Sequence, residues 1–145
     1  MQACRELFVE YQQGLGVSLC FQGFEREAAH LPGDYARPRG RLLLARIAGE
    51  PAGCVALRPL EGGAGEMKRL YVRPAHRGMG IGRMLAECVI DEARALGYST
   101  LKLDTLPSMK EAQRMYEELG FLDTDPYNDN PVEGVRFLAL DLAAR

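Results

Sequence analysis

The sequence lacks any apolar run long enough to cross a membrane. Apolar stretches such as RLLLARIAG, residues 41–49, are far shorter than the roughly 20 residues that a bilayer requires. The N-terminus, MQACRELFVEY, also lacks the cationic and then apolar layout of a signal peptide. We therefore expect a cytoplasmic protein with no membrane partner.

The chain also lacks a strong charge of either sign and a set of metal ligands. Its 18 Lys and Arg residues nearly balance 20 Asp and Glu residues, for a formal net charge of -2, so we expect no nucleic-acid partner. The four cysteines contain no C-x-x-C pair, and only His30 and His76 could join them, so we expect no metal. Neither histidine has a carboxylate or hydroxyl partner at a telling spacing, and we expect both at surface or cap positions.

What the sequence does contain is one alternation of helical and strand patterns. Its 145 residues fit a single domain, residues 1–145. The patterns predict helices at 4–13, 20–30, 80–96 and 107–119, and strands at 41–49, 51–60, 66–72, 99–106 and 134–142. The first two strands form a hairpin in which Pro51 marks an edge or a bulge. This order indicates an α/β or α+β sheet covered by helices.

The helix expected at 80–96 carries an apolar stripe and ends at Gly97. Cys88 shares the predicted face with Met84, Leu85 and Val89. We therefore expect Cys88 to pack in the core as a small apolar residue rather than to act as a nucleophile.

Three alternating glycines, Gly78, Gly80 and Gly82, separate a strand from this helix in LYVRPAHRGMGIGRML, residues 70–85. Glycine within a helix costs roughly 0.5–1 kcal/mol relative to alanine, so such a cluster indicates a structural or functional requirement for glycine. A glycine turn between a strand and a helix lets an anion approach backbone N–H groups that have no intrahelical partner, at the positive end of the helix dipole. With Arg77 and Arg83 beside it, the turn predicts a phosphate site.

Three kinds of phosphate loop compete for this pattern. No Lys-[Ser/Thr] pair follows the glycines, which disfavours a P-loop. A dinucleotide-binding Rossmann loop finds support in Asp104, at the end of the next strand, but it requires a third glycine three residues beyond Gly80, where Arg83 stands. The third candidate is R-x-x-G-x-G, met by Arg77, Gly80 and Gly82.

With that motif, the strand EMKRLYV, the strand STLKLDTL and the segment AQRMYEELGF, the chain resembles the GCN5-related N-acetyltransferase (GNAT) superfamily over residues 41 to about 125. The resemblance implies one domain with a mixed, mostly antiparallel, splayed sheet and about four helices. The family's usual first strand is missing or short here. It also implies transfer of the acetyl group of acetyl-coenzyme A (acetyl-CoA) to a primary amine by direct attack.

The resemblance further implies roles for particular residues. Tyr116 would lie by the thioester sulfur and donate a proton, and Glu66 would deprotonate the acceptor through water; the plainer alternatives are a buried aromatic ring and a solvated strand-end carboxylate. Met109 stands where many members carry an Asn that contacts the cofactor. The residues implied to bind acetyl-CoA are Leu70, Tyr71 and Val72 along the pantetheine arm and Arg77, Gly78, Met79, Gly80, Ile81, Gly82 and Arg83 at the pyrophosphate.

The acceptor is less defined by the sequence. We expect the acceptor to be a small-molecule or amino-acid-like amine, and a peptide N-terminus stays open as an alternative. The protein could also form a homodimer. The first two helices, the loop LPGDYARPRGR and the loop DPYNDNPVEG should wall its pocket, with Asp104, Tyr127, Asn130 and Arg136 as candidate contacts. The alternative functions are a coenzyme A-binding sensor or inactive member, and a Rossmann-type oxidoreductase.

Overall fold

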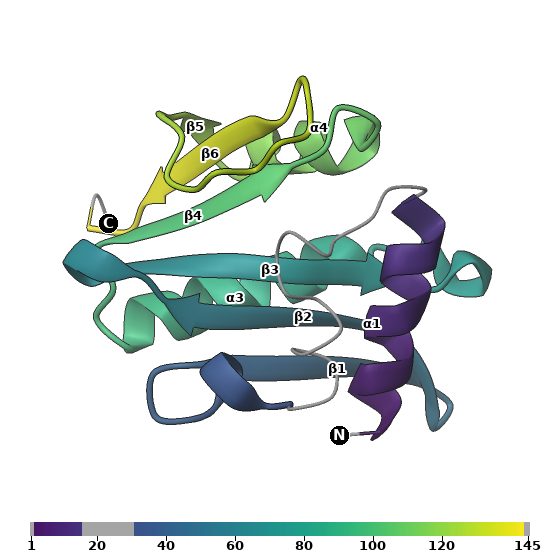
Figure 1. The fold of residues 1–145 in the computed structure, drawn as a ribbon. Coiled ribbons are helices and arrows are strands. Elements are labelled where there is room, and N and C mark those ends of the chain that lie inside the picture. The colour runs from purple at the N-terminus through teal and green to yellow at the C-terminus, as the bar shows by residue number, and fades with distance from the viewer. Residues whose placement is uncertain (1, 16–30, 144–145) are drawn as a thin grey trace.

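The computed structural model describes residues 2–15 and 31–143, which form a six-stranded sheet with helices on both faces (Figure 1). The strand order is β1-β2-β3-β4-β6-β5, and every neighbouring pair is antiparallel except β3 and β4. The elements are α1 (Gln2–Leu15), β1 (Arg41–Ile47), β2 (Glu50–Pro59), β3 (Ala64–Val72), α3 (Ile81–Ala95), β4 (Thr100–Thr105), α4 (Lys110–Glu118), β5 (Leu122–Asp123) and β6 (Arg136–Asp141).

The expected mixed, mostly antiparallel α/β sheet is confirmed, and each expected element within the described residues is present. The helix expected at 20–30, with His30, lies outside the described residues. The two-residue strand β5 is missing from the sequence prediction because Leu122 and Asp123 are both exposed and show no alternation. The parallel pairing of β3 with β4 and the surrounding antiparallel order do not form the parallel sheet of a Rossmann domain.

The β1–β2 hairpin has the irregularity expected from Pro51. The register of β1 against β2 shifts between Ala45, which pairs with Gly53, and Arg46, which pairs with Pro51. Proline lacks the N–H that a regular ladder needs, and the shift accommodates it.

The sheet splays between β3 and β4. Only Ala64, Gly65 and Glu66 of β3 pair with β4, after which the two strands diverge (Figure 1). A second register shift bends β3 at Arg69, whose φ is 60°, against β2. A non-glycine residue in this left-handed region costs about 1–2 kcal/mol, which is a kind of strain that gathers at functional sites.

Two apolar clusters hold the helices on opposite faces of the sheet. One joins α3 and α4 to the sheet through residues such as Leu85, Val89 and Leu103. The other joins α1 to β2 through residues that include Leu7 and Phe8. The open part of the sheet between β3 and β4 is therefore flanked by α4 on one face and α1 on the other.

The core face of α3 differs from the expected one. Its buried residues are Ile81, Leu85, Ala86, Val89, Ile90 and Ala93. The small Ala86 and Ala93 turn the buried arc toward their side, so Met84 and Cys88, at the far edge of the expected stripe, are exposed. The prediction that Cys88 packs in the core is wrong.

Candidate functional site

A groove of about 720 Å³ runs from the open edge of β3 past the glycine turn to α4. Residues from β3, from the turn and from the first turn of α3 form one wall, and α4 supplies the other. Met79 does not line it, because its side chain is exposed at the surface. Every other residue expected to bind the cofactor does: Leu70, Tyr71, Val72, Arg77, Gly78, Gly80, Ile81, Gly82 and Arg83.

The glycine turn lines this groove through Gly78, Gly80 and Gly82. Gly78 and Gly80 have φ values of 81° and 80°, which only glycine adopts readily. The helical ladder of α3 begins with Met84 N–H donating to the Gly80 carbonyl, so the amides of residues 81–83 precede the ladder. These amides lie at the positive end of the helix dipole, which is the arrangement from which the sequence analysis predicts a phosphate site.

The two arginines beside the turn make protein contacts of their own. Arg77 Nε donates to the Val72 carbonyl at 2.9 Å. Arg83 bridges to Glu118 of α4 at 2.9 Å, and both residues line the groove. Both guanidinium groups therefore already have protein acceptors, whereas the amides of residues 81–83 precede the hydrogen-bonded ladder of α3.

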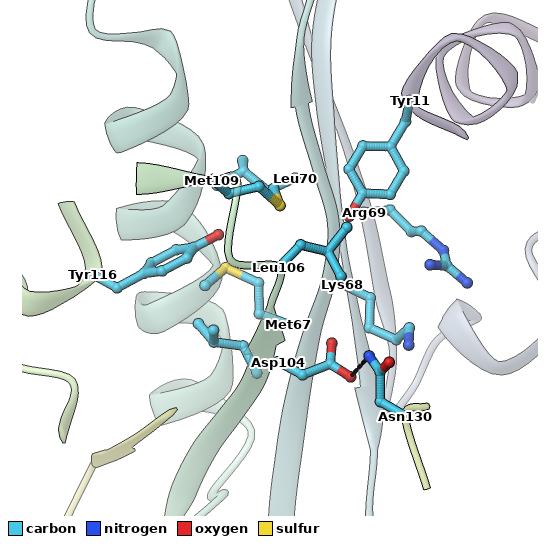
Figure 2. Close-up of a pocket in the computed structure, with 11 residues that line it drawn as sticks. Tyr11, Met67, Lys68, Arg69, Leu70, Asp104, Leu106, Met109, Tyr116 and Asn130 are labelled. Carbon is cyan, nitrogen blue, oxygen red and sulfur yellow. Dashed lines mark hydrogen bonds between the residues drawn. The ribbon is translucent and has the colours of Figure 1, made fainter. Parts of the chain in front are cut away.

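A second, smaller cavity is lined by residues of both β3 and β4 (Figure 2). We call this cavity the recess; its volume of about 30 Å³ holds about two water-sized groups. Four residues line both the recess and the groove, namely Tyr11, Leu70, Met109 and Tyr116. The recess is completed by Met67, Lys68, Arg69, Leu103, Asp104, Leu106 and Asn130.

Tyr116 lies where the two cavities meet. Its side chain comes from α4, is 4% exposed and packs edge-on against Phe121, with ring centroids 5.7 Å apart. Burial raises the pKa of Tyr116 above its ordinary value, with smaller contributions from Tyr11 and Asp104. The hydroxyl is thus a hydrogen-bond donor that holds its proton, and full proton transfer from it is harder than its ordinary pKa would suggest.

Glu66 is fully buried and does not line either cavity. Its Oε1 accepts a bond from Arg58 Nε at 2.8 Å, and its Oε2 accepts one from the Tyr127 hydroxyl at 2.6 Å. Lys68 Nζ lies 3.8 Å from Oε2. The alternative of a solvated strand-end carboxylate is therefore wrong, and any action of Glu66 on an acceptor needs an intervening group.

Lys68 and Arg69 are buried cations at the β3 bulge that the sequence analysis missed. Burial lowers the pKa of Lys68, while Glu66 and, more weakly, Asp104 oppose that shift. Charged residues inside a strand are ordinarily assigned to its solvent face. No residue in EMKRLYV signals the bulge that turns both side chains inward, so the sequence offered no means of finding them.

The four candidate acceptor contacts separate in the structure. Asp104 and Asn130 line the recess and are joined by a hydrogen bond of 3.2 Å (Figure 2). Tyr127 binds Glu66 outside both cavities. Arg136 is held on the surface by Asp123 and by Glu117 of α4, away from both cavities.

The walls of the recess also differ in part from the expected ones. Tyr11 of α1 and Asn130 of the loop at 125–134 contribute, as expected. The loop at 31–41 does not line it; instead Tyr35 packs against Phe8 in the α1 cluster, at 6.2 Å between ring centroids. His76, half-buried, ends a short helical turn and lines the groove.

Residues 2–15 and 31–143 contain neither a cluster of metal ligands nor a membrane-spanning helix. Among them, no three or more His, Cys, Asp and Glu side chains gather in a way that could hold a metal ion. No helix in that part of the chain is both long and apolar enough to cross a membrane.

Comparisons with known proteins show the family from the sequence and the fold from solved structures. The model of the Acetyltransferase (GNAT) family matches residues 2–121. An uncharacterized N-acetyltransferase of Schizosaccharomyces pombe is 42% identical over 139 residues, covering 94% of this chain and 85% of that protein. A GNAT-family acetyltransferase of Staphylococcus aureus has the same fold, with a TM-score of 0.82, 20% identity, and coverage of 97% of this chain and 92% of that chain.

One similar structure was solved with a ligand. It is a GNAT family acetyltransferase of Elizabethkingia anophelis with acetyl-CoA bound. It is 27% identical to this chain, with a TM-score of 0.61, and the match covers 70% of this chain and 76% of that chain.

Proposed function

The chain belongs to the GNAT family of acetyltransferases, and we propose that it transfers the acetyl group of acetyl-CoA to a primary amine of a small acceptor by direct attack. One observation carries the proposal: a groove with an anion site at one end meets a polar recess at the hydroxyl-bearing side chain of Tyr116. A long cofactor with phosphates at one end and a thioester at the other fits the groove, and an amine fits the recess.

The groove has the features that acetyl-CoA requires. The amides of residues 81–83 would bind the pyrophosphate, with Gly78 and Gly80 leaving room for it. The edge of β3 beyond Glu66 is not paired with β4, so the backbone of Leu70 and Val72 would bind the amides of the pantetheine arm. When bound, acetyl-CoA supplies an acetyl group activated as a thioester.

Tyr116 would stabilise the departing sulfur. The acceptor nitrogen bonds to the acetyl carbon, the carbon–sulfur bond breaks, and negative charge develops on sulfur. A hydroxyl that is buried and retains its proton stabilises that charge by donating a hydrogen bond. The thiolate can then take its proton from solvent after release.

The acceptor amine must lose a proton during the reaction, because a lysine-like amine with a pKa near 10.4 is only about one part in a thousand neutral at pH 7. Asp104 lines the recess and would hold the incoming ammonium. Glu66 remains our candidate for the base. Its carboxylate lies next to Lys68 and does not line the recess, so it would act through water. The two carboxylates therefore have separate roles.

The proposal is tested by incubating the protein with acetyl-CoA and a panel of primary amines while following thiol release. We expect thiol release that depends on one class of amine and an acetylated product of matching mass. A coenzyme A-binding sensor would instead bind acetyl-CoA, seen as a rise in melting temperature, without amine-dependent release. Binding without turnover across the panel would contradict the proposed function.

A further inference from the structure

The loop at 125–134, which we call the strap, connects β5 to β6 as irregular backbone. Three of its side chains donate hydrogen bonds to carboxylates of the sheet, and these are Tyr127, Asn128 and Asn130. The Tyr127 hydroxyl donates to Glu66 Oε2 at 2.6 Å. The two asparagine amides donate to Asp104 Oδ2 at 3.0 and 3.2 Å, and Figure 2 shows the second of these bonds. One loop thus holds both of the carboxylates to which the proposed function gives a role.

These two carboxylates lie on different strands, at the point where the sheet opens. Glu66 is the last residue of β3 that pairs with β4, and its partner there is Lys102. Asp104 follows Lys102 along β4 on the same face of the sheet, because side chains alternate along a strand. The strap covers this face, since the Tyr127 ring lies 5.7 Å from Lys102 Nζ. It therefore joins β3 to β4 where the two strands begin to diverge.

The amide group of each asparagine is held at both of its ends. Asn128 Oδ1 accepts the backbone N–H of Asn130 at 2.9 Å, and Asn130 Oδ1 accepts the backbone N–H of Val132 at 3.0 Å. Such turns are typical of asparagine, whose side chain bonds its own backbone two residues on. Each amide oxygen thus stabilises the strap, and each amide nitrogen is left to bind Asp104. Both bonds reach the same oxygen of Asp104, so the strap sets the orientation of that carboxylate.

Tyr127 holds Glu66 in a comparable way. Its half-buried ring packs edge-on against Phe137, with ring centroids 5.5 Å apart. Burial and, more weakly, the neighbouring Glu66 raise the pKa of Tyr127, so its hydroxyl keeps the proton that it donates to the carboxylate. A hydrogen bond to an ionised acceptor is stronger than one between neutral groups. Neither Tyr127 nor Asn128 lines the groove or the recess, so both act on the site through the carboxylates that they bind.

From these contacts, and resting on the proposed function, we infer that Tyr127 and Asn128 are positioning residues for acetyl transfer that act through two different carboxylates. Tyr127 orients Glu66 for removal of the proton from the acceptor amine. Asn128, together with Asn130, orients Asp104 for binding of the acceptor ammonium. The strap thereby fixes the base on β3 relative to the ammonium site on β4.

The test measures kcat and the acceptor KM of two single variants with acetyl-CoA and the best amine of the panel. Tyr127→Phe keeps the ring and removes the hydroxyl, so kcat should fall about tenfold, a part of the roughly 10²–10⁴ that a general base contributes, with KM within about twofold. Asn128→Ser keeps an oxygen for the turn but loses the amide, so KM should rise about fivefold with kcat within about twofold. Tyr98→Phe is the matched control and should change neither, because the Tyr98 hydroxyl also donates at 2.6 Å, to the Arg39 carbonyl, and Tyr98 lines neither cavity.

Double variants separate positioning from a general loosening of the strap. Tyr127→Phe should have no further effect on kcat in Glu66→Gln, and Asn128→Ser none on KM in Asp104→Asn, whereas the effects of Tyr127→Phe and Asn128→Ser should multiply. Undiminished effects in the carboxylate variants, or an equal fall in kcat with unchanged KM in both single variants, would overturn the inference.

The wild type distinguishes this failure from that of the proposed function. A wild type that acetylates an amine, with single variants that match it in both parameters, overturns the inference and leaves acetyl transfer standing. A wild type that acetylates no amine contradicts the proposed function, and the inference falls with it.

Discussion

Replacing Gly80 by alanine separates the binding role of the glycine turn from its conformational role, because Gly62 provides a matched control. Gly80 has a φ of 80° and Gly62 a φ of 73°, and a Cβ added at either would meet no atom within 4 Å. Each alanine therefore incurs the same left-handed backbone strain of about 1–2 kcal/mol and little else. For a domain of this size that loss lowers the melting temperature by roughly 2–8 °C in both variants.

Only the Gly80 substitution should weaken the binding of acetyl-CoA. Gly80 begins α3 and sets the direction of the amides at 81–83, whereas Gly62 lies before β3, at the other end of that strand. Loss of one hydrogen bond to a charged phosphate costs about 1.5–3 kcal/mol, or about 10- to 100-fold in affinity. Titration calorimetry with acetyl-CoA measures the difference. Equal affinities for acetyl-CoA in the two variants, whether unchanged from the wild type or reduced, would refute the assignment of the glycine turn to the cofactor.

Gly82→Ala should have the opposite effect on stability. Gly82 lies within the first turn of α3, and an added Cβ would make an ordinary contact of 3.6 Å with Val72. Alanine in a helix is favoured over glycine by about 0.5–1 kcal/mol, so the unliganded protein should melt at a slightly higher temperature. The same Cβ enters the groove wall and should weaken acetyl-CoA binding. A variant that is more stable and binds as tightly as the wild type would remove Gly82 from the cofactor site.

Three further predictions concern the carboxylates and the choice of cofactor. Glu66→Gln should lower kcat/KM most at low pH, and the defect should shrink as the pH approaches the pKa of the amine; a defect that is constant with pH would return Glu66 to a structural role. Asp104→Asn should weaken acceptor binding and therefore raise the KM for the acceptor. Hydrogen bonding from Arg73, the residue after β3, lowers the pKa of Glu10 in α1, so this bridge stabilises the fold at neutral pH and is lost as the pH falls through the lowered pKa. Glu10→Gln should reduce the free energy of unfolding by about 0.2–1 kcal/mol at pH 7 and not at pH 2 in denaturant titrations, and an equal loss at both would be inconsistent with the ion pair. At equal concentration, acetyl-CoA should raise the melting temperature more than NAD or ATP, and a larger shift with NAD would contradict the cofactor assignment.

Local patterns in the sequence predict most of the fold and most of the residues that line the groove. The glycine turn, the strand before it and the helix after it are all encoded within residues 64–95, so spacing and turn chemistry were sufficient to predict them. The groove brings together residues that are close in sequence with α4, whose apolar face includes Tyr116. Short-range information of this kind survives in a single sequence.

The recess could not be predicted to the same extent, because it depends on long-range packing. Lys68 and Arg69 line it because β3 bulges against β2. Glu66 is held in the interior by Arg58 of the neighbouring strand β2 and by Tyr127, which lies 61 residues away in the sequence. The exposure of Cys88 has a similar origin, since small residues of α3 decide which arc faces the sheet. Register and packing of this kind arise between elements and leave no mark in the residues of one of them.

We propose that the groove and the recess form one acetyl-transfer site centred on Tyr116, and Tyr116→Phe tests this most directly. The substitution keeps the buried ring against Phe121 and removes only the hydroxyl. Single-turnover transfer from isotopically labelled acetyl-CoA to the best amine of the panel should slow by about 10²- to 10³-fold, as for the loss of one donor to a developing negative charge, while the Kd for acetyl-CoA stays within about twofold of the wild type. A Tyr116→Phe enzyme that transfers the label at the wild-type rate would contradict the claim.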